Sequence, residues 1–200
     1  RKFTEPKIEA LNHALKGLPQ DRVRFHLCWG SWHGPHMTDI PMKEIVGSML
    51  KINAGAYSFE AGNVRHEHEW SVWKETKLPD DKLILPGVVS HATNGVEHPE
   101  LVADRIERFA RLVGRENVIA GTDCGLGGRV HPDIAWAKLQ TLAGLVHDLD
   151  PELDARRADG VELTKRGRPQ PLVCRQEGRG PIYRLNLLGR VVDVLADGRL

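Results

Sequence analysis

The stretch from Arg24 to His36, RFHLCWGSWHGPH, concentrates side chains that bind metal ions. It holds three histidines and one cysteine within thirteen residues. His26 and Cys28 stand two positions apart in an apolar segment that ends at Gly30, and residues i and i+2 of a strand point to the same side. Neutral imidazole and thiolate are zinc ligands. We therefore predict that both side chains reach one metal ion, with further ligands from elsewhere in the chain.

The cysteine content is more typical of free or metal-bound thiols than of a disulfide. The chain has three cysteines, Cys28, Cys124 and Cys174, which are far apart in the sequence. One would stay unpaired, and no stretch reads as a secretory signal. Such sparing use suits a reducing compartment. We predict a cytoplasmic protein in which Cys174 has no role in the site.

The composition argues against two classes of partner. The 200 residues are 40% hydrophobic and 28% charged, as in an ordinary globular protein. The formal net charge of +1 is too small for a dedicated nucleic-acid surface, and no apolar run approaches a membrane span. We expect neither nucleic acid nor a membrane as a partner. The sequence starts RKFTEPK, without methionine, which predicts a fragment or a processed product.

Four strand–loop–helix units fill the first part of the chain. Continuously apolar segments predict strands at 23–29, 54–62, 82–90 and 116–125, and helical spacing predicts helices at 7–18, 41–50, 98–114 and 131–146. Strands of this kind alternating with helices are typical of a parallel α/β sheet covered on both faces. Four units make half of a (β/α)8 barrel or a small doubly wound sheet. The CGLGG run lacks the spacing of a nucleotide-binding loop.

The character of the chain changes near residue 148. All the histidines and tryptophans precede this point, and the remainder is rich in Arg, Gly and Pro. We predict a domain over 1–147 and an atypical tail over 148–200. The segment 181–200 is expected to form a hairpin or a partner-facing strand. Nothing in the tail suggests chemistry.

The ends of the predicted strands carry four side chains that bind metals. Active sites of β/α barrels lie at the C-terminal ends of the strands. His26 and Cys28 end the first strand, Glu60 the second and Cys124 the fourth. Together they predict a tetrahedral zinc site, since two thiolates favour zinc over magnesium or calcium. The alternative stays open, because a buried cysteine is usually a small hydrophobe and a strand-end glutamate usually a solvated cap.

Four stretches resemble the C-terminal catalytic barrel of the cobalamin-independent methionine synthase family, which includes epoxyalkane:coenzyme M transferase. They are HLCWGSWHGPH, AYSFEAGN, GVVSHATNGVEHPELVADRIERFARLVGRENVIAGTDCGLG and HPDIAWAKLQTLA, between about residues 23 and 143. The resemblance implies the C-terminal half of a (β/α)8 TIM barrel and a missing N-terminal half. It also implies that zinc is held by His26, Cys28, Glu60 and Cys124. An open half-barrel is expected to expose a large apolar face.

The resemblance implies zinc-dependent methyl transfer to a thiol, with zinc activating the thiolate. In the family the thiol is homocysteine and the donor is 5-methyltetrahydropteroyltriglutamate, so the pathway is methionine biosynthesis. Three alternatives stay open. They are alkyl transfer to another thiol such as coenzyme M, a hydrolase that uses His66 and His68, and an inactive zinc-binding fragment. The charges flanking His66 and His68 favour a solvated loop or helix start.

The chain departs from the family at the proposed proton donor. The family pattern is Gly-Val-x-Asp-x-His, whereas this chain has Ser90 in place of the aspartate and Ala92 in place of the histidine. His91 is the catalytic candidate that remains, although it is expected to point to the other side of an extended strand. Asp123 is expected to orient a ligand or to cap a turn. The substrate-binding candidates are Trp29, Asn94 and Glu97.

Overall fold

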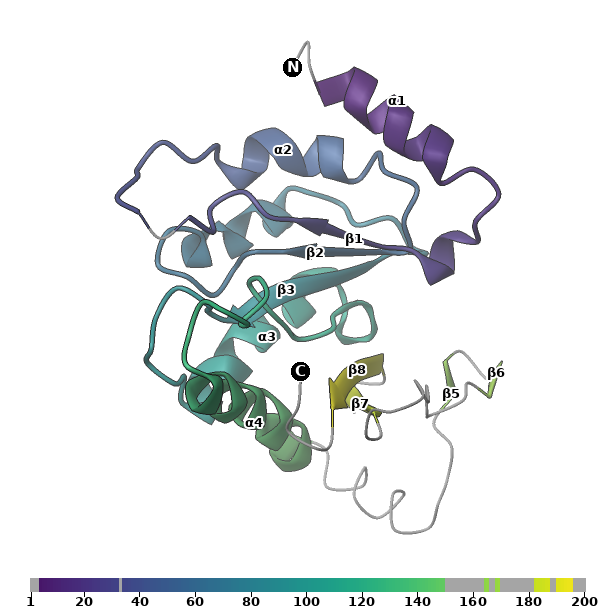
Figure 1. Cartoon of the computed structure of the whole chain (residues 1–200). Helices are drawn as coiled ribbons and strands as arrows, with labels where there is room; N and C mark the ends of the chain where they lie inside the picture. Colours follow the sequence, from purple (N-terminus) through teal and green to yellow (C-terminus); the bar gives the residue numbers. More distant parts are fainter. Residues whose placement is uncertain are drawn as a thin grey trace.

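The structure is a computed structural model that describes residues 4–32, 34–149, 164–165, 168–169, 182–187 and 190–195 (Figure 1). Its α-helices are α1 (Thr4–Ala14), α2 (Met42–Met49), α3 (Pro99–Val113) and α4 (Pro132–Leu149). Its 3-10 helices are η1 (Gln20–Arg22), η2 (Glu67–Lys74) and η3 (Arg115–Asn117). The strands are β1 (Arg24–Leu27), β2 (Ala56–Phe59), β3 (Leu83–Val89), β4 (Gly121–Thr122), β5 (Thr164–Lys165), β6 (Arg168–Pro169), β7 (Ile182–Leu187) and β8 (Arg190–Leu195).

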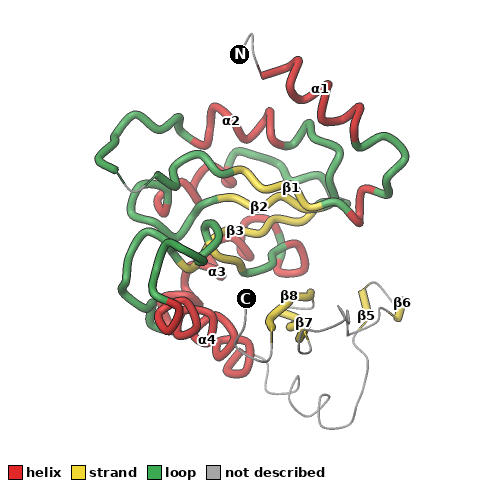
Figure 2. Tube along the Cα trace, viewed as in Figure 1, coloured by secondary structure: helices red, strands yellow, loops and turns green. Residues whose placement is uncertain are grey.

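Strands β1 to β4 form one parallel sheet in the order in which they occur along the chain. The predicted α/β class with four parallel β/α units is confirmed. The strands are shorter than the apolar segments that predicted them, and β4 has only two residues. Figure 2 shows β1, β2 and β3 side by side, with α2 drawn above them and α3 below them in this view. Because the four strands run parallel, all their C-terminal ends lie along one edge of the sheet.

One face of the sheet packs against the helices and forms the main core. Along β2, Tyr57 and Phe59 point to this face and are almost fully buried. The Phe59 ring lies 5.5 Å from Trp73 of η2 and 5.9 Å from Phe109 of α3, measured between ring centres. Helix α3 buries one apolar stripe, as its spacing predicts, and ends at Gly114, whose φ of 89° favours glycine.

The opposite face of the sheet differs from the expectation of a large exposed apolar surface. Its apolar side chains form a small cluster in which each is 4–8% exposed: Ala56, Leu83, Leu85 and Ile119. Along β1, this face carries Arg24 and His26 instead, paired in register with Ala56 and Ser58 of β2. The expectation is wrong, because the apolar side chains of this face are few and almost fully buried.

The tail beyond residue 148 is described only in short pieces. Strands β7 and β8 pair antiparallel, which matches the hairpin predicted within 181–200, and β5 pairs antiparallel with β6. Helix α4 extends to Leu149, past the predicted boundary at 147. The division into domains stays a prediction, because most of the tail and Cys174 lie outside the described residues. Within the described part, no helix is long and apolar enough to cross a membrane.

Candidate metal centre

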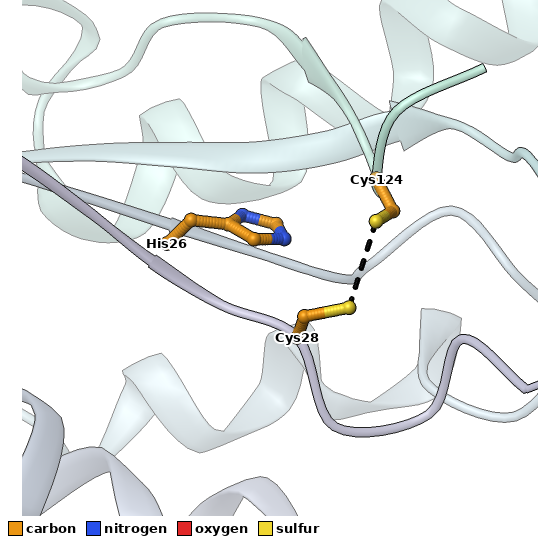
Figure 3. Close-up of side chains that lie close together, drawn as sticks. All are labelled: His26, Cys28 and Cys124. Atoms are coloured by element: carbon orange, nitrogen blue, oxygen red, sulfur yellow. Dashed lines mark hydrogen bonds between the residues drawn. The ribbon is translucent and has the colours of Figure 1, made fainter. Parts of the chain in front are cut away.

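Three of the four predicted metal ligands come together at the C-terminal edge of the sheet. His26 lies on β1, Cys28 directly follows β1, and Cys124 follows β4. Their ligand atoms all lie within 4.8 Å of one another. The two sulfurs are 3.5 Å apart, and Figure 3 shows the side chains pointing toward a common region. Among the described residues this is the only such group of three or more His, Cys, Asp and Glu side chains.

His26 is oriented by the neighbouring strand. Its Nδ1 lies 2.9 Å from the hydroxyl oxygen of Ser58, the residue paired with it on β2. This contact occupies Nδ1 and leaves Nε2 for a metal ion. Loss of hydration lowers the pKa of His26, although the nearby Glu60 carboxylate opposes the shift. The imidazole is therefore neutral at neutral pH, which is the form that binds metals.

The geometry of the two thiols fits one shared zinc ion. Two zinc–sulfur bonds of about 2.3 Å at the tetrahedral angle would place the sulfurs about 3.8 Å apart, close to the observed separation. In the absence of a cation, desolvation and the neighbouring Cys124 and Glu60 raise the pKa of Cys28 to about 11, while the Ser31 hydroxyl opposes the rise. The thiol then stays protonated at neutral pH, so a cation is needed to hold it as thiolate.

Glu60, the fourth predicted ligand, lies beside this group but not within it. Its side chain is 1% exposed, and Oε1 is 3.6 Å from the Cys28 sulfur. Oε1 also accepts hydrogen bonds from the Ser31 hydroxyl at 2.8 Å and the Gly30 amide at 3.2 Å. Oε2 accepts one from the Asn63 side-chain amide at 2.9 Å. The carboxylate is thus fully hydrogen-bonded by the protein, and its role as a ligand stays a prediction.

Asp123 holds the turn that follows Glu60. Its Oδ1 accepts hydrogen bonds from the backbone amides of Ala61 and Gly62, both at 2.7 Å, and its Oδ2 accepts one from Asn63 at 3.2 Å. Burial raises the pKa of Asp123 to about 6 in spite of these three donors. The single amide group of Asn63 therefore links Asp123 to Glu60. This role of Asn63 was not predicted from the sequence, although Asn63 stands only three residues after Glu60.

Ser31 was also missed, and it contacts several groups of the site. Its hydroxyl makes a short contact with the Cys28 sulfur as well as the bond to Glu60. Its backbone carbonyl accepts hydrogen bonds from Arg129 Nη1 at 2.6 Å and from His91 Nε2 at 3.4 Å. The only sequence signal for Ser31 was its position in the loop that follows Cys28.

The three substrate-binding candidates have different surroundings. Trp29 lines a cavity of about 780 Å3 together with Cys28, and its indole N–H donates to the Ile40 carbonyl at 3.0 Å. Asn94 lies exposed in the loop after β3. Glu97 is buried, accepts a hydrogen bond from the Ser90 amide at 2.8 Å and pairs with Lys138 of α4 at 2.9 Å. Only Trp29 of the three lines the cavity.

Comparison with known proteins shows which proteins this chain resembles. No family model matches the chain. The 2-hydroxypropyl-CoM lyase of Xanthobacter autotrophicus is 26% identical over 149 residues, which is 62% of this chain and 40% of that protein. A B12-independent methionine synthase from Shewanella sp. W3-18-1, solved in complex with selenomethionine, superposes with a TM-score of 0.56 and 21% identity, covering 76% of this chain and 46% of that one. A Listeria monocytogenes protein described as a vitamin-B12 independent methionine synthase gives 0.51 and 20%, covering 73% and 41%. The predicted family resemblance is confirmed.

The chain spans less than half the length of each of these three relatives. The two structural matches show the fold, a β/α sheet like that of the methionine synthases. They leave open which reaction the chain performs. The chemistry has to be argued from its own side chains.

His91, the candidate catalytic residue, lies on the inside of the molecule. Its side chain is fully buried, and its Nε2 faces the carbonyl of Ser31. Ser31 lines the same cavity as Cys28. The ring is therefore behind the cavity wall and not in the group of three metal-binding residues. Its catalytic role stays a prediction.

The histidines of the hydrolase alternative are not brought together with other ligands. His66 is buried and contacts Glu69 through Nδ1 at 2.8 Å, whereas His68 is exposed. Neither belongs to a cluster of three or more potential ligands in the described part of the chain. The structure therefore does not support a metal-dependent hydrolase built on this pair.

Proposed function

We propose that the chain is the zinc-binding part of a thiol alkyltransferase that transfers a methyl group to a homocysteine-like thiol. The observation that carries the proposal is the convergence of His26, Cys28 and Cys124 within 4.8 Å at the C-terminal edge of the sheet. The relatives support it, because one is a methionine synthase crystallised with selenomethionine and another is a CoM lyase. We further propose a cytoplasmic location, in keeping with the free thiols.

The residues proposed to hold zinc are His26, Cys28 and Cys124, with Glu60 as the fourth ligand. Bound zinc would supply a thiol substrate in its thiolate form at neutral pH. The protein's part is to fix the ligands. Ser58 orients His26, and Asn63 and the Gly30 amide hold the Glu60 carboxylate beside Cys28. Partners of this kind set ligand orientation and basicity.

The proposed reaction forms a sulfur–carbon bond and breaks the bond between the alkyl carbon and its leaving atom. The electron pair leaves with that atom, which takes up a proton, while the proton of the thiol goes to solvent. We propose His91 as the proton source, because its ring touches Ser31, a residue of the cavity wall. Trp29 supplies apolar surface to the cavity that would receive the substrates, a methyltetrahydrofolate-like donor and the thiol.

A second candidate keeps the site and changes the thiol to one such as coenzyme M. It is favoured by the sequence relative, whose name refers to a coenzyme M compound. A third possibility is a zinc-binding fragment without activity, because the chain spans only 40–46% of its relatives. The three candidate functions share the metal site and differ in the product that the chain forms, if it forms any.

Metal binding tests the site directly. The purified chain, stripped of metal and titrated with zinc against a chromophoric chelator, is expected to bind one zinc ion. Cobalt in its place should show thiolate-to-metal absorption. Cys28→Ser and Cys124→Ser are expected to lower zinc affinity by at least a hundredfold, whereas Cys174→Ser, the matched control, should not. Equal affinity in all three variants would refute the site.

Turnover then separates the three functions. The zinc-loaded chain is supplied with methyltetrahydrofolate or an epoxide as donor, and with homocysteine or 2-mercaptoethanesulfonate as acceptor. Methionine formation supports the first proposal, and alkylation of the sulfonate thiol alone supports the second. Stoichiometric zinc without any product identifies the inactive fragment and contradicts an enzymatic role for this chain by itself.

A further inference from the structure

The cavity beside Cys28 is lined by one arginine and one aspartate, and they differ in their partners. It has a volume of about 780 Å3, and three of its lining residues are titratable or charged besides the cysteine: His36, Asp39 and Arg129. The first two lie in the loop between β1 and α2, and Arg129 lies in the loop between β4 and α4. The proposed alkyl transfer has not assigned a role to any of them.

The negative charge of Asp39 is already compensated by its neighbours. Its Oδ1 is 3.0 Å from His36 Nδ1, and its Oδ2 is 3.3 Å from Arg65 Nε and 3.7 Å from His66 Nε2. His36 Nε2 in turn faces the Trp32 carbonyl at 2.8 Å. Both ring nitrogens of His36 thus face oxygen atoms of the protein, so the His36 ring is held by the loop.

Arg129 is the uncompensated cation of this cavity. Its guanidinium stays charged at any physiological pH and has five N–H donors. One of its nitrogens donates to the Ser31 carbonyl at 2.6 Å, and within the described residues Arg129 forms no ion pair. The residue is exposed to the cavity solvent. Because Ser31 also contacts Cys28, the cation is linked through one residue to a metal-binding thiol.

We infer that Arg129 binds an anionic group, a carboxylate or sulfonate, at the other end of the thiol substrate. The inference rests on the proposed function for the thiol end, which would lie at the metal site. Arginine recognises planar or branched anions through paired, charge-assisted hydrogen bonds. A neutral thiol would offer the Arg129 guanidinium no charged partner. Arg129 is thus a specificity-determining residue that selects small anionic thiols over neutral ones.

A matched set of small probes tests the assignment by calorimetric titration of the full zinc-loaded chain. The probes are 3-mercaptopropionate, 3-mercapto-1-propanol, which has similar size without the charge, and propionate, which lacks sulfur. The wild type is expected to bind mercaptopropionate at least tenfold more tightly than either of the others. Arg129→Gln should weaken the binding of mercaptopropionate roughly tenfold or more. The same substitution should change the affinity for mercaptopropanol by less than about twofold.

Arg111→Gln is the matched control, because Arg111 is 78% exposed on α3 and, among the described residues, pairs only with Glu107 of the same helix. It should leave all three affinities unchanged. Circular dichroism and the zinc titration check that both variants keep their fold and metal. Equal affinity of the wild type for the charged and the neutral thiol would overturn the inference, as would an equal effect of Arg129→Gln on both.

Two further outcomes separate this inference from the proposed function. In the first, mercaptopropionate binds no better than propionate, and Arg129→Gln weakens the binding of propionate. Arg129 then binds anions but does not serve a thiol substrate, and the inference is wrong. If the chain takes up no zinc while mercaptopropionate still binds through Arg129, the proposed function fails and the anion preference stands. Absence of binding by both anions refutes the inference.

Discussion

Replacing Asp123 with asparagine separates the shape of this buried side chain from its charge. The new carbonyl oxygen can still accept the two backbone hydrogen bonds that Asp123 Oδ1 receives from the turn after β2. The new NH2 group, however, would face the NH2 group of Asn63, which now donates to Oδ2 at 3.2 Å. Asn63 cannot rotate its amide without losing its bonds to Glu60 Oε2 and from the Arg65 backbone amide. One buried donor is therefore left unpaired.

The expected magnitudes follow from these contacts. An unsatisfied buried donor destabilises by about 1–3 kcal/mol. Loosening Asn63 frees the carboxylate of Glu60 beside the metal site, and loss of such an orienting contact typically lowers metal affinity by about 10- to 100-fold. We expect Asp123→Asn to fold, to bind zinc more weakly by that factor, and to keep the cysteine-to-metal absorption.

The pH dependence of stability gives a second, independent measure. In the folded protein the pKa of Asp123 is about 6, above its ordinary value of 3.8. Below pH 4 the group is neutral in both the folded and unfolded states. Between pH 4 and pH 6 the unfolded chain ionises first and binds fewer protons. The free energy of unfolding contributed by Asp123 therefore falls as the pH rises, by about 3 kcal/mol across this window.

Urea unfolding of the zinc-free wild type and of Asp123→Asn at pH 4 and pH 7 measures this difference. The variant lacks the titrating group, so the stability of the wild type relative to the variant should decrease by about 3 kcal/mol between the two pH values. Other carboxylates cancel in the comparison. A relative stability that does not change with pH, or that increases, would refute the assigned burial and protonation of Asp123.

Three further predictions concern packing and protonation. Gly87→Ala should destabilise by about 3 kcal/mol in urea unfolding, because an added Cβ would lie 2.2 Å from Asp123 Oδ1. Gly47→Ala, its control in α2, meets nothing within 4 Å and should stabilise by roughly 0.5–1 kcal/mol. Lys138→Met should lower the free energy of unfolding by about 3–5 kcal/mol, since it leaves a buried carboxylate unpaired. Zinc affinity should rise with pH, up to tenfold per pH unit for each thiol proton displaced, because the pKa of Cys28 is about 11 without metal.

The sequence was sufficient to predict the elements and the three residues that come together as the candidate metal centre. Continuous apolar segments between helices indicate buried parallel strands, and the parallel order follows from the alternation. Because parallel strands share one C-terminal edge, His26, Cys28 and Cys124 could be assigned to one place without knowledge of the packing. The expectation of a large exposed apolar face failed, because a pattern of apolar residues does not show whether a sheet face is covered, and the four apolar side chains of this face are 4–8% exposed.

The hydrogen-bonded surroundings of the metal centre could not be predicted, because they depend on loop conformation. Ser31, Asn63 and Arg129 are ordinary polar residues in loops, and nothing in their spacing distinguishes them from solvated neighbours. Their roles arise from contacts between residues up to 98 positions apart, such as the bond from Arg129 to the Ser31 carbonyl. Glu97, a polar residue near a strand end that was predicted to bind substrate, is paired with Lys138, a contact that the sequence also did not indicate. Its role in substrate binding stays a prediction.

The placement of Glu60 shows why strand-end position alone does not define a ligand. The place of Glu60 at the end of β2 brings its carboxylate to within 3.6 Å of the Cys28 sulfur. The Gly30 amide, the Ser31 hydroxyl and the Asn63 side chain already donate hydrogen bonds to the oxygens of this carboxylate. A carboxylate held by this many donors loses electron density to them and moves only if they move. Whether Glu60 completes the coordination is therefore decided jointly by Ser31, Asn63 and, through Asn63, Asp123. The two carboxylates share one amide group, so a change at Asp123 reaches Glu60 through Asn63, in addition to any effect on the adjacent Cys124. That coupling makes Asp123→Asn a probe of the fourth ligand that leaves the Glu60 side chain itself unchanged.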